Sequence, residues 1–201
     1  MAGKLPAKDD RRVQRTRRSL REALVALLIE RGWEGFSVQD VCDRADIGRS
    51  TFYTHFADKE DLVQGGLEDL RAELRAHVLA TGADPEHPFA YSRGLLEHAH
   101  EQQRLFRALV GKKSGQLVQK MFRQMVLDLV REDLAPRLAA GPRSEAAVAF
   151  LAGGFFEILT WSVEAKNAPG PQDADGIFRE LAAPVLAAAG ISDTSARTRG
   201  R

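Results

Sequence analysis

Two very short segments with an apolar face, joined by a tight turn, constrain the fold of this chain more than any other feature of its sequence. Ser37 is a favourable N-cap for a helix over residues 38–45. Asp46 follows it, and Asp is one of the few residues other than glycine that tolerate a left-handed turn. A second short helix is then predicted over residues 49–56. Together with a longer amphipathic helix before them, these segments predict a compact three-helix unit that holds the second short helix in place.

Helical periodicity continues along the rest of the chain. Leucines at positions 20, 24, 27 and 28 lie on one face of a helix over residues 12–31, and Gly32 follows as its stop. Asp58 caps a long helix with an acidic residue, Asp61, three positions later. Further helices are predicted over residues 89–101, 103–110, 115–133, 145–165 and 174–189. Because no strand-like alternation stands out, the predicted fold is all-α with about nine helices.

The net charge of +1 conceals an uneven distribution along the chain. Residues 1–21 hold eight Lys and Arg against two Asp, whereas residues 22–60 hold four basic residues against eight acidic ones. A basic N-terminal arm of this kind is commonly either a solvated tail or a nucleic-acid contact. The positive charge is therefore predicted to belong to an arm and not to a whole domain.

Several classes of protein are excluded by composition and spacing. The single cysteine, Cys42, forms no internal disulfide and is interpreted as a small core residue. His77, His98 and His100 do not share an i, i+4 metal-binding spacing, so neither a metal nor any other cofactor is expected. No run approaches the roughly 18 consecutive apolar residues of a membrane span, so we expect a cytoplasmic protein with no membrane partner.

The second short helix presents a face of small polar groups and hydrogen-bond donors. It is predicted to bury Phe52 and Phe56, an i, i+4 apolar pair. The exposed side chains are Arg49, Ser50, Thr51, Tyr53, Thr54 and His55. Such a face fits the major groove of DNA, where donors read base edges and Tyr and His reach phosphates.

Residues 37–62, SVQDVCDRADIGRSTFYTHFADKEDL, resemble the DNA-binding signature of the TetR family of bacterial transcriptional regulators. The resemblance covers about residues 12–62, and the remainder is similar only in helix count and in its Gly-rich penultimate helix ending near Trp161. Three positions depart from the family pattern: Asp46 stands for a glycine, Gly48 for a serine cap and Cys42 for an alanine. A glycine N-cap gives up only a few tenths of a kcal/mol relative to serine, so these departures leave the resemblance intact.

The resemblance assigns DNA-binding roles residue by residue. It implies that Ser37 and Val38 contact phosphate and that Arg49, Ser50 and Thr51 contact the bases. It also implies that Tyr53, His55 and Lys59 contact the DNA backbone. Elementary chemistry agrees for Arg49, the residue here that can bond guanine in bidentate fashion. It also agrees for Lys59, which lies in the first turn of a helix, where free N–H groups favour a phosphate.

The helix over residues 145–165 is apolar on all sides and must be covered on all sides. Together with the last helix it is predicted to form a four-helix interface between two copies of the chain, and the resemblance implies the same arrangement. The predicted interface residues are Phe150, Gly153, Gly154, Glu157, Phe178, Leu181 and Val185. Such a dimer would place two recognition helices about one DNA turn apart on a palindromic operator.

Aromatic and thioether side chains gather on the helices of the C-terminal part. The set predicted to line an effector pocket is Phe106, Leu109, Met121, Phe122, Met125, Phe155, Leu159 and Trp161. Plain hydrophobic core is the more common use of such residues, so that alternative stays open. Glu157 is either an interface partner of an arginine or the polar anchor of an effector.

The sequence thus predicts three regions: residues 1–62 as basic arm and helix-turn-helix domain, 63–190 as helical effector-binding and dimerisation domain, and 191–201 as a flexible basic tail. The predicted function is that of a non-enzymatic, homodimeric repressor released from double-stranded operator DNA by a small, largely apolar effector. An activator or a ligandless regulator of the same fold remains an alternative. A small-molecule-binding protein or an all-α enzyme is another, although no catalytic constellation is legible in the sequence.

Overall fold

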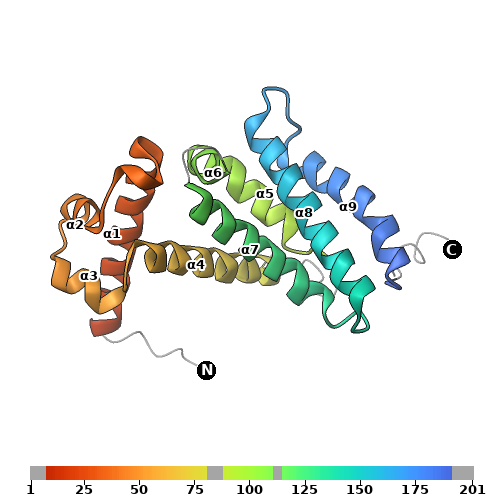
Figure 1. Ribbon diagram of the computed structural model, residues 1–201, viewed down its shortest axis with the longest axis horizontal. Coiled ribbons are helices and arrows are strands. Elements are labelled where there is room, and N and C mark those ends of the chain that lie inside the picture. Colours follow the sequence, from red (N-terminus) through yellow and green to blue (C-terminus); the bar gives the residue numbers. More distant parts are fainter. Residues whose placement is uncertain (1–7, 81–87, 111–114, 192–201) are drawn as a thin grey trace. The chain divides into compact units, whose positions relative to one another are not determined.

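The computed structural model describes residues 8–80, 88–110 and 115–191, and within these residues the chain is all-α (Figure 1). In the described ranges nine α-helices and one short 3-10 helix follow each other in this order: α1 (Lys8–Arg31), η1 (Trp33–Gly35), α2 (Val38–Ala45), α3 (Arg49–His55), α4 (Lys59–Ala80), α5 (Ser92–Glu101), α6 (Gln103–Val110), α7 (Gly115–Leu134), α8 (Pro142–Glu164) and α9 (Pro171–Ala188). The predicted fold class is confirmed.

Differences from the predicted helix boundaries have local causes. Helices α8 and α9 begin at Pro142 and Pro171, earlier than predicted, because proline at the first helical position loses no hydrogen bond. Helix α5 begins later than predicted, because Phe89 adopts a left-handed conformation with φ of 62°. The one-turn helix η1 was not predicted.

The chain divides into two compact units. The first contains Met1–Asp69 and Ala108–Gln119, and the second contains Leu70–Arg107 and Lys120–Arg201. The division falls inside α4, several residues beyond the predicted boundary at residue 62, and the first unit also includes a later segment. The expected basic tail lies outside the described residues, apart from Ile191.

The core of the first unit forms where α1 packs on α2 and η1. Leu20 and Leu27 of α1 are buried together with Val41 of α2. Cys42 is 1% exposed, and burial raises the pKa of its thiol, as expected of a core cysteine. The predicted apolar face of α1 is therefore the face that supports α2, and α2 in turn contacts α3.

Helices α5, α8 and α9 pack against one another in the second unit. Phe178 of α9 lies between the rings of Phe89 and Phe155, with centroid separations of 4.9 and 4.8 Å. The neighbouring residue, Arg179, donates to the carbonyls of Pro88 and Phe89, at 3.0 and 2.6 Å. The middle of α9 is thereby tied to the turn that precedes α5.

Within the described residues one helix, α8, is long and apolar enough to cross a membrane, with a mean hydropathy of 1.6 over its most apolar stretch. Half of that stretch is buried within the fold. Core helices of soluble proteins pass the same test, so α8 is evidence of a buried helix as much as of a membrane span.

Candidate nucleic-acid interface

Helix α2 begins at a complete capping box. The Asp40 amide donates to the Ser37 hydroxyl oxygen at 3.3 Å, and the Ser37 amide donates to the Asp40 carboxylate at 2.9 Å. The Ser37 hydroxyl also donates to Asp40, and these bonds from Ser37, aided by Arg31, lower the pKa of Asp40 to about 2. The predicted cap is confirmed, and it fixes an eight-residue helix that is too short to be stable alone.

The turn between the two short helices is left-handed at Asp46, with φ of 53° and ψ of 46°. The Asp46 amide donates to the Asp43 carbonyl at 3.4 Å, and the Ile47 amide donates to the Cys42 carbonyl at 3.0 Å. These bonds satisfy carbonyls that the end of α2 leaves free. The prediction that Asp46 adopts this conformation is confirmed.

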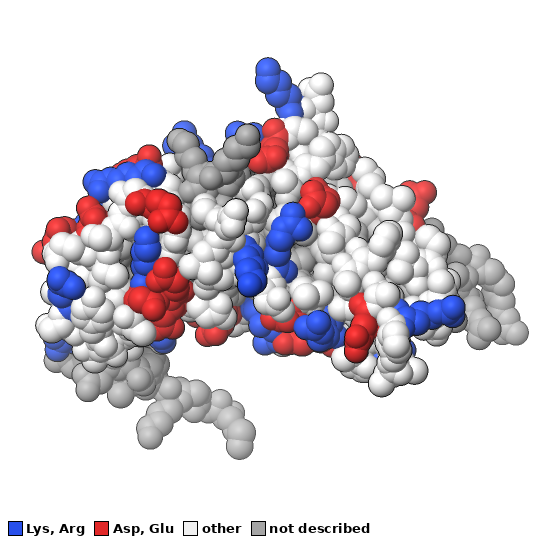
Figure 2. All heavy atoms as spheres, viewed as in Figure 1, with Lys and Arg blue, Asp and Glu red and all other residues white. Residues whose placement is uncertain are grey.

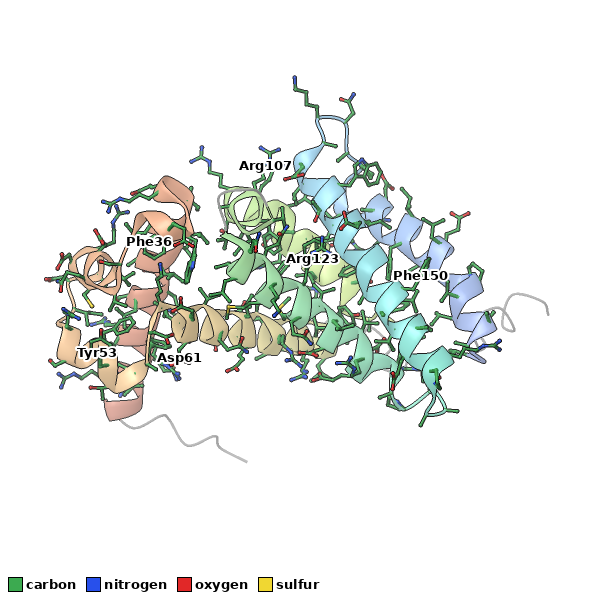
Figure 3. The ribbon with its side chains drawn as sticks, viewed as in Figure 1. Phe36, Tyr53, Asp61, Arg107, Arg123 and Phe150 are labelled. Atoms are coloured by element: carbon green, nitrogen blue, oxygen red, sulfur yellow. The ribbon has the colours of Figure 1, made fainter. Side chains whose placement is uncertain are left out.

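Helix α3 has one buried and one exposed face. Phe52 is fully buried and its ring lies 5.9 Å from that of Phe56, which is 3% exposed. The exposed side chains of this helix are Arg49, Ser50, Thr51, Tyr53 and Thr54, and His55 is half-buried. The structure thus gathers the predicted base-reading residues on one short surface, and Figure 3 shows Tyr53 projecting from it.

Arg49 and Tyr53 contact each other on this exposed face. The Arg49 guanidinium donates to the Tyr53 hydroxyl at 3.2 Å, and its Cζ lies 5.7 Å from the centre of the tyrosine ring. This hydrogen bond raises the pKa of Arg49 above its ordinary value. The exposed Arg49 side chain is therefore oriented by a contact that the sequence did not predict.

Lys59 departs from its predicted role as a phosphate contact. Its ammonium donates to the carbonyls of Trp33 and Phe36, at 2.9 and 3.2 Å. It also lies 4.2 Å from the centre of the Trp33 ring and 5.0 Å from that of Phe36. Lys59 therefore fastens the start of α4 to η1, because two of its three donors already have partners inside the protein.

The predicted basic arm is largely part of a helix. From Lys8 onward the chain is helical, and Arg11, Arg12, Arg15 and Arg18 are exposed on α1. Arg17 instead lies over the Phe56 ring at 5.2 Å, and Arg21 pairs with Asp69. The exposed cations remain available to phosphates, whereas Lys4 lies outside the described residues. Figure 2 shows basic and acidic side chains intermixed on the viewed face of this unit.

Ser37 is exposed and Val38 is half-buried at the start of α2. Helix α2, the left-handed turn and α3 together form a helix-turn-helix whose second helix has a free polar face. Proteins with this arrangement place that second helix in the major groove of DNA. The fold and the site therefore define the class of helix-turn-helix proteins.

Comparison with known proteins narrows this class to a family. Residues 20–65 match the model of the bacterial regulatory proteins of the tetR family. An uncharacterized HTH-type transcriptional regulator of Bacillus subtilis (strain 168), YxbF, is 36% identical over 78 residues, which are 38% of this chain and 20% of that protein. This chain thus matches about a fifth of the length of that curated relative.

Solved structures extend the likeness over most of the chain. A TetR transcriptional regulator from Streptococcus agalactiae 2603V is 25% identical with a TM-score of 0.64, covering 87% of this chain and 97% of its own. Thermus thermophilus FadR, a TetR-family transcriptional repressor in complex with lauroyl-CoA, is 20% identical with a TM-score of 0.55, covering 83% and 92%. Residues 20–65 thus match the TetR family in sequence, and most of the chain is similar in fold to solved members of that family.

Most of the residues predicted to line an effector pocket are core. Phe106, Phe122, Phe155 and Leu159 are at most 1% exposed, and the first two rings meet edge to face at 5.4 Å. Met125 and Leu109 are also buried, and Leu109 belongs to the first unit. Met121 is half-buried, and Trp161 is exposed.

A cavity of about 390 Å³ lies elsewhere in the second unit. None of the eight predicted pocket residues lines it. Its lining residues are Leu74, Arg75, Val78, Leu79, Ala90, Tyr91, Leu129, Glu132 and Asp133. The hydroxyl of Tyr91 is buried and has no hydrogen-bond partner among the described residues. Sequence spacing gave no signal for this cavity, because its lining comes from three separate segments.

Helices α8 and α9 expose an apolar face that includes part of the predicted dimer interface. Phe150 and Leu181 are 66% and 62% exposed, Gly154 is also exposed, and Gly153 and Val185 are half-buried. Figure 2 shows a wide, mostly uncharged surface over these two helices, and Figure 3 shows Phe150 projecting from α8.

Phe178 does not belong to this face, which corrects its predicted interface role. It is 2% exposed, because its ring packs inward between Phe89 and Phe155. Trp161 and Ile177, which are 43% and 36% exposed, take its place. Helical spacing could have found both, since Trp161 lies four residues after Glu157 and Ile177 lies four residues before Leu181.

Glu157 has an arginine partner within its own chain. Its carboxylate lies 2.8 Å from the Arg123 guanidinium, and that guanidinium also stacks over the Phe156 ring at 3.9 Å. The Glu157 side chain is 64% exposed. An exposed, paired carboxylate is poorly suited to anchor an effector inside the protein. The arginine that pairs with Glu157 comes from α7 of its own chain, which neither of the two alternatives specified.

Proposed function

We propose that this chain is a DNA-binding transcriptional regulator that acts as a homodimer. The observation that carries the proposal is the exposed polar face of α3, held out by the buried Phe52 and by the capped helix α2. Arg49 supplies the bidentate donors that distinguish guanine. The exposed arginines at the start of α1 supply charge for phosphates.

The test is a fluorescence-anisotropy titration with DNA from the region upstream of the chain's own gene. We expect salt-sensitive binding that prefers one sequence over a scrambled duplex. Arg49→Ala should reduce this preference, since each bidentate base contact contributes about 1–3 kcal/mol of discrimination. Arg44→Ala is the matched control, because Arg44 is an exposed arginine of the same unit whose guanidinium is paired with Glu30 at 2.6 Å. If the wild type has no sequence preference at any salt concentration, the proposal is wrong.

Dimerisation through the face of α8 and α9 is the second part of the proposal. Large apolar side chains exposed together mark a protein interface, and a twofold dimer presents two recognition helices to a palindromic site. Leu181→Glu should therefore yield a monomer in sedimentation experiments. Leu117→Glu places the same charge on another exposed leucine outside this face and should leave the dimer intact. Equal effects of the two variants would argue against the interface.

Control by a small molecule is the third part. The lauroyl-CoA complex of a protein with a similar fold supports it, as does the cavity in the second unit, whose volume is at the lower end of the range of about 300–1,000 Å³ found for ligand sites. We infer a largely apolar effector that weakens DNA binding, which makes the chain a repressor. A ligand screen by thermal stabilisation, followed by DNA titration with each hit, tests this inference. Hits that strengthen DNA binding would instead indicate the alternative in which the effector favours the DNA-bound state.

A further inference from the structure

The recognition helix contains a short series of contacts that runs from the hydrophobic core to an exposed guanidinium. Phe52 is fully buried, and the Tyr53 ring meets it edge to face at 5.3 Å with an interplanar angle of 85°. Tyr53 is itself half-exposed, with 50% of its surface open to solvent. Its ring is therefore held against the core while its hydroxyl faces the surface that meets DNA.

Arg49 lies one helical turn before Tyr53 and contacts it twice. The guanidinium donates a hydrogen bond to the tyrosine hydroxyl at 3.2 Å and packs against the ring, with Cζ 5.7 Å from its centre. Two contacts on different parts of the tyrosine side chain restrict both the position and the plane of the guanidinium. The plane matters, because bidentate bonding to guanine requires both donors to point at the same base edge.

We propose that Tyr53 is a positioning residue that sets how strongly Arg49 discriminates guanine in each half of the binding site. This inference rests on the proposed function. It assigns to the Tyr53 hydroxyl a role that differs from the phosphate contact expected from sequence. In that earlier role the hydroxyl adds affinity for any DNA, whereas in the positioning role it adds affinity for one base pair.

The expected size follows from the freedom that Arg49 would regain. Immobilising one long side chain on binding reduces affinity by about 2- to 12-fold. A side chain that is already oriented avoids most of this loss. Removing the Tyr53 hydroxyl should therefore lower discrimination at one base pair of each half-site by about 2- to 12-fold, with little change in binding to unrelated DNA.

The experiment begins with selection from a library of random DNA duplexes by the full-length wild type, Arg49→Ala and Tyr53→Phe proteins. Anisotropy titrations follow with three duplexes: the selected duplex, a duplex changed at the guanine whose selection requires Arg49, and a scrambled duplex. Arg44→Ala serves as the control for loss of an exposed arginine from the same unit. Circular dichroism shows whether each variant remains folded.

We expect Tyr53→Phe to select the same motif with weaker preference at the guanine that Arg49→Ala abolishes, and to keep the wild-type salt dependence. When Tyr53→Phe is combined with Arg49→Ala, it should cause no further loss of discrimination at that base pair, because no guanidinium remains to be oriented. The inference is overturned if Tyr53→Phe weakens the selected and scrambled duplexes equally, or if its effect persists in full in the Arg49→Ala background. A wild type that selects no motif would instead refute the proposed function itself.

Discussion

Lys59 gives the sharpest test of the structure against the expectation from sequence. Its ammonium donates to two carbonyls and lies over two aromatic rings. Hydrogen bonds from a charged group contribute about 1.5–3 kcal/mol each, and a cation–π contact contributes about 0.5–2 kcal/mol. Fixing a lysine side chain costs about 2 kcal/mol of rotamer entropy. Because Lys59 is only partly buried, we take the lower end of each range and expect Lys59→Met to lower the free energy of unfolding by about 2 kcal/mol.

Two measurements on the same variant separate this role from a phosphate contact. Denaturant unfolding followed by circular dichroism gives the stability, and DNA titrations over a series of salt concentrations give the number of phosphate contacts. If Lys59 of each protomer contacted one DNA phosphate, the dimer would make two such contacts. Their loss would reduce the slope of log K against log salt by about 1.8, since each contact contributes about 0.9. We expect the slope to stay unchanged.

Lys120→Met is the matched control for this experiment. Lys120 is an exposed lysine of α7, and we expect its replacement to change neither stability nor salt slope. If the Lys59→Met protein has wild-type stability and a slope reduced by about 1.8, Lys59 does not fasten α4 to η1 but contacts phosphate, as the sequence predicted.

Three further predictions concern residues that stabilise each unit separately. Because the pKa of Asp40 falls from 3.8 to about 2 on folding, its stabilising effect is complete above pH 4 and is lost as the pH falls through 2. The difference in unfolding free energy between wild type and Asp40→Asn should therefore shrink between pH 5 and pH 2, and a constant difference would contradict this. Asp46→Gly should be more stable than Asp46→Ala by about 1 kcal/mol in denaturant unfolding, since alanine is strained at positive φ; equal stabilities would contradict the left-handed turn. Arg179→Met should lower stability by about 3–5 kcal/mol, because Asp175, which is 8% exposed, loses its cation. Adding Asp175→Leu should recover part of that loss, and no recovery would show that the carbonyl contacts of Arg179 matter more.

The features that the sequence predicted correctly depend on neighbours close in the chain. Ser37 and Asp40 are three residues apart, and the Asp61 amide donates to Asp58 at 2.7 Å across the same interval. The conformation of Asp46 depends on its own residue type and on the carbonyls of α2. Such local interactions form within one turn, so the pattern of residue types is enough to identify them.

The features that the sequence missed depend on contacts between distant segments. Lys59 occupies a helix start that suits a phosphate, yet Trp33 and Phe36 bring two carbonyls and two rings to it from another element. Phe178 and Ile177 are adjacent apolar residues on α9, and only the packing of Phe89 and Phe155 decides that Phe178 turns inward. A helix that is apolar on more than one side carries no information about which side its own chain will cover.

The membership of residues Ala108–Gln119 in the first unit has a consequence for synthesis on the ribosome. Gly115 has φ of 71°, a conformation that favours glycine, and a Cβ atom there would lie 3.1 Å from the Trp33 ring, so the start of α7 lies close against Trp33. The segment that completes the unit of the helix-turn-helix emerges only after Leu70–Arg107 of the other unit. Bringing the two ends of that intervening stretch together costs loop-closure entropy, which grows only slowly with length. The nascent DNA-binding unit is thus incomplete until residue 119 has left the exit tunnel, which ties its maturation to the synthesis of the part proposed to regulate it.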